Sequence, residues 1–210
     1  MLLLVRHGAT PTTGAVLPGR APGLHLADHG REQAAAAAER IAEVARVVAV
    51  YSSPLERARE TASPIARKLG QRVRVERGLL ECDFGSWTGG ELKTLSKRKE
   101  WATVQRWPSG WRFPGGESFS EMQARMLACV DRLRERHPGE AVVAVSHADP
   151  IKSVVAHALG THLDLFQRIV VSPASVTAVA YAEAGPAVLA VNSLGTLPAL
   201  GPPQGAAGKQ

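Results

Sequence analysis

Short apolar runs alternate with longer amphipathic stretches along most of the chain. The apolar runs have the length and Val/Leu content of buried strands, which are predicted at residues 2–5, 47–51, 73–75, 141–145, 176–181 and 187–191. The amphipathic stretches place apolar residues three and four positions apart, which predicts helices over residues 28–45, 54–69, 117–136 and 150–159. This alternation favours an α/β fold, a three-layer sandwich with a mostly parallel central sheet and helices on both faces. The last two strands are expected to form an antiparallel edge.

Residues that start or stop helices flank these stretches. Asp28 can cap the first helix, and Ser53 with Pro54 supplies a cap and a first-turn proline for the second. Gly160 is placed to end the helix that begins near Pro150.

Residues 80–118 interrupt the alternation of strands and helices. They are rich in glycine, proline and tryptophan, with one short helix predicted over residues 91–103. We therefore predict a single domain over residues 1–196 with a small lid insertion at about 82–118. Residues 197–210, mostly glycine, proline and alanine, are expected to form a flexible tail. The lid carries four tryptophans, expected to pack within it rather than to line a substrate pocket: Trp87, Trp101, Trp107 and Trp111.

Composition narrows the classes of protein that fit. The 210 residues are 45% hydrophobic with a net charge of +6, which suits a soluble domain that attracts anionic substrates. Basic residues are dispersed apart from the run at 97–99, so no nucleic acid is expected as a partner. Arg6 and His7 cut the opening apolar run too short for a signal or a membrane span. Cys82 and Cys129 show no metal or redox spacing, so a cytoplasmic location is expected.

Basic residues follow three of the predicted strands. The strands lead into Arg6 and His7, into a segment ending at Arg57, and into His147. Because ligands of such sheets bind beyond the carboxyl ends of the strands, these side chains are expected to converge. Arginine is suited to bidentate contact with phosphate, so the group predicts an anion pocket.

Several motifs carry a resemblance to a known family. Residues 4–10 (LVRHGAT) resemble the signature of the histidine phosphatase superfamily, which includes the cofactor-dependent phosphoglycerate mutases. Further matches follow in the family's order at residues 52–62, 80–89, 114–121 and 145–147. The resemblance covers roughly residues 2–195.

The resemblance implies catalytic roles for five residues. His7 would be the nucleophile, and Glu81 would act first as general acid and then as general base. Arg6, Arg57 and His147 would hold the oxygens of the transferring phosphoryl group.

Three more residues complete the predicted substrate-binding set. Gly8 lets the backbone approach a ligand, and Ala148 follows His147 at a helix start. Thr13 is a candidate to replace an asparagine that the family commonly carries.

Each of these side chains, considered alone, could also have a purely structural role. Arg57 could be a solvated helix residue, and His147 a hydrogen-bonded core histidine. Glu81 could pair with Arg77 or Arg72 at the surface. Their joint occurrence at successive strand ends favours the active site.

Elementary chemistry agrees with these roles. Phosphoryl transfer needs positioning and a positive field more than covalent help, and cationic side chains supply that field. Neither a metal nor a cofactor is therefore predicted. Glu81 needs a raised pKa to donate a proton, and His147 is expected to be protonated beside the anion.

The activity predicted is hydrolysis of a small phosphomonoester. Residues 82–89 are similar to the phosphatase branch, and the lid is short for an enzyme that must protect its intermediate from water. A phosphomutase and a non-catalytic phospho-ligand-binding protein are the alternatives. The natural substrate and the oligomeric state, including a homodimer, stay open.

Overall fold

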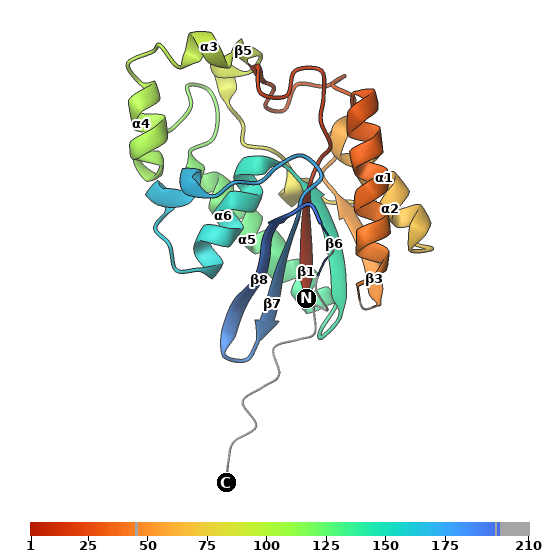
Figure 1. Ribbon diagram of the computed structural model, residues 1–210. Coiled ribbons are helices and arrows are strands. Elements are labelled where there is room, and N and C mark those ends of the chain that lie inside the picture. Colours follow the sequence, from red (N-terminus) through yellow and green to blue (C-terminus); the bar gives the residue numbers. More distant parts are fainter. Residues whose placement is uncertain (45, 196, 198–210) are drawn as a thin grey trace.

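A six-stranded mixed sheet forms the centre of the protein (Figure 1). The computed structural model describes residues 1–44, 46–195 and 197. The strand order is β4-β3-β6-β1-β7-β8, with the first four strands parallel and the last two antiparallel. This confirms the predicted sheet and its antiparallel edge. The strands are β1 (Leu2–Arg6), β3 (Val47–Ser52), β4 (Val73–Val75), β6 (Ala141–Ser146), β7 (Val176–Ala182) and β8 (Gly185–Ser193).

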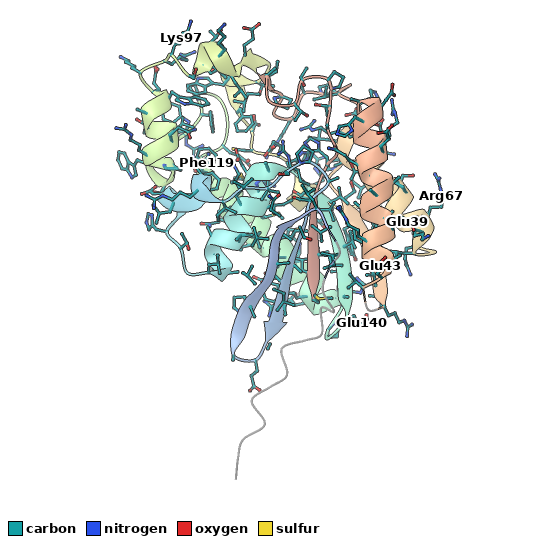
Figure 2. All side chains as sticks on the ribbon, in the orientation of Figure 1. Glu39, Glu43, Arg67, Lys97, Phe119 and Glu140 are labelled. Atoms are coloured by element: carbon teal, nitrogen blue, oxygen red, sulfur yellow. The ribbon has the colours of Figure 1, made fainter. Side chains whose placement is uncertain are left out.

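Helices cover both faces of this sheet. Leu3 and Val5 of β1 face the pair α1 (Asp28–Ala42) and α2 (Glu56–Lys68), whereas Leu2 and Leu4 face α5 (Phe119–Arg136) and α6 (Ala148–Ala158). Alternate side chains of a strand point to opposite faces, so one apolar run serves both cores. The predicted three-layer sandwich is therefore confirmed. Charged residues such as Glu39 and Arg67 lie on the outer sides of α1 and α2 (Figure 2).

The lid, residues 82–118, packs as a separate aromatic cluster beside α5 and α6. Trp87 is buried among Phe84 and Phe113, and Trp101 and Trp111 pack against this cluster. Packing is thus confirmed for three tryptophans. Trp107 is 59% exposed, which contradicts the expectation for that residue.

The predicted single helix over residues 91–103 is wrong. The chain forms two shorter helices, α3 (Leu92–Leu95) and α4 (Trp101–Arg106). The five residues between them, SKRKE, contain no apolar side chain that could pack on the cluster, so the helix does not continue. Two short strands, β2 (Val16–Leu17) and β5 (Gly90–Glu91), join the lid to the loop after β1.

Helix boundaries differ from the predictions where tertiary contacts intervene. Helix α2 begins at Glu56, two residues later than predicted, with Leu55 at its N-cap. Asp28 is the first residue of α1 and its side chain does not cap the helix. Helix α6 begins at Ala148, two residues early, and Gly160 follows its end with a φ of +65°, as predicted.

The two remaining sequence expectations concern the tail and membranes. Leu197 is buried against the core that faces α1 and α2, whereas residues 198–210 lie outside the described residues, as does Ala45. Within the described ranges, the longest helices are too short or too polar to cross a bilayer.

Candidate active site

The register of the parallel strands brings three loops to one level. Arg6 pairs with Ser146 across β1 and β6, and Ser52 pairs with Val145 across β3 and β6. Backbone hydrogen bonds extend this alignment, because the amide of His7 donates to the carbonyl of Ser146 over 3.0 Å. The residues that follow these strands therefore meet at one edge of the sheet.

His7, Arg57 and His147 lie together at this edge, as predicted. The two imidazole rings are 5.2 Å apart between centroids, at an interplanar angle of 61°. The Nε of Arg57 donates to Nε2 of His7 over 3.3 Å. All three side chains are buried, and Arg57 is the largest of the fully buried side chains. Arg57 is thus not the solvated helix residue that its helix position alone would suggest.

Hydrogen bonding fixes which nitrogen of His7 carries the proton. Nδ1 lies 2.7 Å from the carbonyl oxygen of Gly8, and a carbonyl can only accept, so Nδ1 donates. Nε2 is left with its lone pair. Burial, followed by the positive charge of Arg57, lowers the pKa of His7 to about 3, so the imidazole is neutral at physiological pH. A neutral imidazole with an available Nε2 is the form that can act as a nucleophile.

His147 is held by Ser53, a residue that was predicted to cap a helix. The Nε2 of His147 lies 2.9 Å from the hydroxyl oxygen of Ser53. Burial lowers the pKa of His147 well below its ordinary value, and the charge of Arg57 adds to this effect. The expectation that His147 is protonated beside a bound anion stays a prediction.

Three buried nitrogen atoms of the site have no hydrogen-bond partner among the described residues. They are Nε of Arg6, Nη1 of Arg57 and Nδ1 of His147. The other ends of these groups are fixed, since Nη1 of Arg6 donates to the carbonyl of Val171 over 2.7 Å. Buried donors without partners are rare in native proteins, and an anion with several acceptor oxygens would satisfy the two guanidinium groups.

Glu81 lies in the same charged neighbourhood. Its side chain is 7% exposed, and Oε1 accepts a hydrogen bond from the amide of Cys82 over 2.9 Å. Burial, reinforced by the negative charge of Asp149, raises the pKa of Glu81 to about 7. Among the described residues Glu81 forms no ion pair, so pairing with Arg72 or Arg77 is not its role. Its carboxyl group can carry a proton near neutral pH.

The structure gives Gly8 a different constraint from the one expected. Its amide donates to the hydroxyl of Thr61 over 2.9 Å. A Cβ atom on Gly8 would lie 2.4 Å from the carbonyl oxygen of Gly30, so the close approach is to α1. Thr13 is exposed, and its hydroxyl accepts from the amide of Thr10 over 2.8 Å. Ala148 is half-buried as the first residue of α6.

Sequence reasoning missed several supports of the site. Ala174 has a φ of +55°, and its amide donates to the carbonyl of Arg6 over 3.0 Å. A left-handed alanine costs on the order of 1 kcal/mol, and here it secures the end of β1. Arg20 and Arg125 both donate to the carbonyl of Glu81. Only contacts across more than 40 residues reveal these roles, and no local pattern signals them.

Two other kinds of functional site come into question, a metal site and a reactive cysteine. No group of three or more His, Cys, Asp or Glu in the described part of the chain could hold a metal ion. Burial raises the pKa of the Cys82 thiol far above its ordinary value, which makes it a poor nucleophile.

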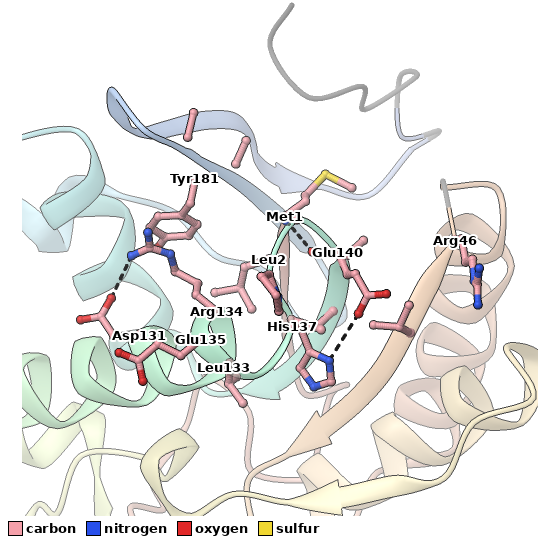
Figure 3. A pocket seen from close by; sticks show the side chains of 17 residues that line it. Met1, Leu2, Arg46, Asp131, Leu133, Arg134, Glu135, His137, Glu140 and Tyr181 are labelled. Carbon is pink, nitrogen blue, oxygen red and sulfur yellow. Dashed lines mark hydrogen bonds and ion pairs between the residues drawn. The ribbon is translucent and has the colours of Figure 1, made fainter. Parts of the chain in front are cut away.

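A large pocket opens at the opposite edge of the sheet, with a volume of about 820 Å³ (Figure 3). His137, Arg134 and Tyr181 line it; Asp131 pairs with Arg134 over 3.0 Å, and the carboxylate of Glu140 lies 3.7 Å from Nδ1 of His137. It lies at the amino ends of the parallel strands, away from His7. Ligands of such sheets bind beyond the carboxyl ends of the strands, which is the end where His7 lies.

Fold and site together define an α/β protein with a buried, positively charged anion site built on two histidines and two arginines. The chain belongs to the histidine phosphatase superfamily (branch 1), whose family model matches residues 2–194. The resemblance of the sequence motifs is thereby confirmed.

Two curated relatives and one solved structure illustrate the similarity. The bifunctional protein Rv2228c of Mycobacterium tuberculosis is 36% identical over 201 residues, covering 93% of this chain and 54% of that protein. The chain thus spans about half the length of this relative. Phosphoserine phosphatase 1 of Hydrogenobacter thermophilus is 29% identical over 91% of each chain. The mycobacterial glucosyl-3-phosphoglycerate phosphatase Rv2419c superposes with a TM-score of 0.82 at 26% identity, covering 91% of this chain and 98% of that chain.

Proposed function

We propose that this protein hydrolyses small phosphomonoesters through a phosphohistidine formed on His7. The observation that carries the proposal is the state of that imidazole: neutral, with Nδ1 fixed on the Gly8 carbonyl and Nε2 beside the Arg57 guanidinium. A nucleophile held in one tautomer and one orientation needs little reorganisation to reach the transition state.

In the first step, Nε2 of His7 attacks phosphorus and the ester P–O bond breaks. The protonated carboxyl of Glu81 gives its proton to the leaving oxygen, so an alcohol departs. In the second step, the Glu81 carboxylate takes a proton from water, and the resulting hydroxide oxygen attacks the phosphohistidine. The P–N bond breaks and inorganic phosphate is released. A pKa of Glu81 near 7 suits both the donating and the accepting step.

Arg6, Arg57 and His147 stabilise the charge that spreads over the three equatorial oxygens. Each has a buried nitrogen without a partner among the described residues. A phosphate would order this site by accepting from both guanidinium groups, with His147 donating once it is protonated. Because these groups supply the positive field, the proposed reaction uses no metal ion.

The relatives support phosphate ester hydrolysis and small substrates. One is named for phosphoserine and another for glucosyl-3-phosphoglycerate, both phosphomonoesters of small hydroxy acids. We infer the same class of substrate for this chain.

The test is turnover of p-nitrophenyl phosphate in EDTA, with a chemical search for the intermediate. The parent should release inorganic phosphate, and denaturing quench in alkali should trap an acid-labile phosphohistidine. His7→Ala should abolish both signals. His29→Ala is the matched control, since His29 is exposed on α1. Tight phosphate binding without turnover, or a label that persists in His7→Ala, would overturn the proposal.

A further inference from the structure

Two consecutive residues of the loop after β1 touch the two halves of the site. The carbonyl of Gly19 accepts a hydrogen bond from Nη2 of Arg57 over 2.7 Å. The next residue, Arg20, donates from Nε to the carbonyl of Glu81 over 2.8 Å. The Gly19-Arg20 peptide unit, together with the side chain of Arg20, therefore links the guanidinium of Arg57 to the backbone of Glu81.

Two carboxylates lie beside the guanidinium of Arg20. Nη2 pairs with the carboxylate of Glu117 over 2.7 Å, and Nη1 lies 3.6 Å from that of Asp83. Glu117 in turn accepts from the amide of Asp83 over 3.1 Å and pairs with Arg125 over 2.9 Å. Arg20 is thus directed at the Glu81 segment and its supports, with one hydrogen bond to the Glu81 carbonyl and ion pairs to two neighbouring carboxylates.

Gly19 suits this position because glycine has no Cβ atom and readily adopts a positive φ. Its φ is +51°, in the left-handed region that favours glycine, and a Cβ atom would lie 2.8 Å from the hydroxyl of Thr88. The strand pair β2–β5 ties the same loop to the lid. The loop is therefore held between Arg57, the Glu81 segment and the lid.

We propose that Gly19-Arg20 is a bracket that sets the distance between the phosphate-binding Arg57 and the proton donor Glu81, with Arg20 as a positioning residue. The inference rests on the proposed function, because it gives Glu81 the role of general acid. Proton transfer requires the donor within about 2.6–3.2 Å of the leaving oxygen, and a displacement of about 1 Å can cost on the order of 100-fold in rate. A fixed backbone under Glu81 meets that requirement.

Loss of Arg20 should displace Glu81 without unfolding the protein. Arg125 still contacts Glu117 and still donates to the carbonyls of Gly78 and Leu80 over 2.7 and 3.0 Å. The segment therefore keeps one of its two arginine supports. The expected defect falls on the two steps that use Glu81, and only the first of them, protonation of the leaving group, depends on the substrate.

The experiment compares two substrates in Arg20→Met, in Glu81→Gln and in the double variant. In the first turnover, measured by rapid mixing as release of the alcohol, Arg20→Met should slow phosphoryl transfer from an alkyl phosphomonoester by about 10- to 100-fold. For p-nitrophenyl phosphate, whose leaving group hardly needs protonation, the first-turnover loss should stay within about 3-fold, because this measurement leaves out the later hydrolysis of the phosphohistidine, in which Glu81 acts as base for every substrate. In the double variant Arg20→Met should add little to the loss from Glu81→Gln, since both changes remove one function.

Arg132→Met is the matched control. Arg132 lies seven residues after Arg125 on α5 and pairs with Glu76 over 3.4 Å. Glu76 lies five residues before Glu81 in the sequence, so this ion pair is close to the Glu81 segment without contacting Glu81 itself. Arg132→Met should leave both substrates unaffected. Thermal unfolding of each variant verifies that the fold is retained.

The outcomes distinguish a failure of the proposed role of Arg20 from a failure of the proposed function. If Glu81→Gln slows the first turnover of both substrates equally, the general acid is misassigned and the proposed function fails. If Glu81→Gln discriminates between the substrates and Arg20→Met does not, the bracket alone is wrong. A rise in KM with unchanged kcat in Arg20→Met would mean that Arg20 binds substrate directly, which also overturns the bracket.

Discussion

Glu81→Gln should stabilise the folded protein at neutral and alkaline pH. The folded environment raises the pKa of this carboxyl from 4.5 to about 7, chiefly by burial and then by the charge of Asp149. Between these pH values the unfolded chain has lost the proton that the folded protein keeps. The free energy of unfolding therefore falls as pH rises through this window and levels off above about pH 7.

The size of the effect follows from the two pKa values. A rise from 4.5 to about 7 corresponds to about 3 kcal/mol of stability, present at about pH 4 and lost by about pH 8. Glutamine resembles the protonated carboxyl in shape and does not titrate. The parent and the variant should thus be similar in stability at low pH, and the variant should exceed the parent by about 3 kcal/mol at about pH 8.

Urea denaturation of both proteins from about pH 4.5 to pH 8 measures this difference. Buffers should lack phosphate and sulfate, because an anion that binds the folded state would add its own stabilisation. Other groups, including the two buried histidines, titrate in both proteins and largely cancel in the comparison. The unfolding free energy of the variant minus that of the parent is the quantity to plot against pH.

A difference that stays constant across this range would refute the reasoning. It would mean that the Glu81 carboxyl ionises in the folded protein near its ordinary pKa, despite its burial. The physical basis for its role as proton donor at neutral pH would then be lost.

Three further results are expected. Arg57→Met should raise the pKa of His7 above its value of about 3, since a positive charge beside the imidazole is removed, while the persisting burial keeps it below its ordinary value; ¹⁵N NMR titration of the imidazole measures this. Gly30→Ala should destabilise the fold by about 1–3 kcal/mol in urea unfolding, opposite in sign to the usual helix effect, because its Cβ would lie 2.0 Å from a backbone oxygen. Sulfate binding to Glu81→Gln near pH 7 should take up about one proton, on His147, and calorimetry in two buffers would contradict this if the heats agree.

The convergence of the site was predictable because β1, β3 and β6 are strongly apolar and alternate with helices. Once these strands are parallel, their carboxyl ends must meet, and the residues at these ends or directly after them are Arg6-His7, Ser52-Ser53 and His147. The alternation of apolar residues along β1 fixes which side chains enter each core. Local pattern and topology were sufficient for these features.

Contacts between distant segments set the limits of prediction. Serine is a residue type that favours helix N-caps, yet the hydroxyl of Ser53 hydrogen-bonds to His147, which lies 94 residues later. The link from Arg20 to Glu81 spans 61 residues and joins two irregular loops. In the lid, the choice between one helix and two depends on which side chains reach the aromatic cluster. None of these partners is visible in a local window of sequence.

The charge state of the site also constrains its ligands. Near neutral pH both imidazoles are neutral, because burial and Arg57 lower their pKa values, and the Glu81 carboxyl, with a pKa of about 7, is protonated in about half of the molecules. Arg6 and Arg57 then supply two fixed positive charges around His7. A phosphomonoester dianion balances these two charges, whereas a diester brings one charge and covers a further oxygen with an alkyl group. Under the proposed function, the burial that keeps His7 neutral therefore leaves the two arginines to favour a doubly charged, unsubstituted phosphoryl group.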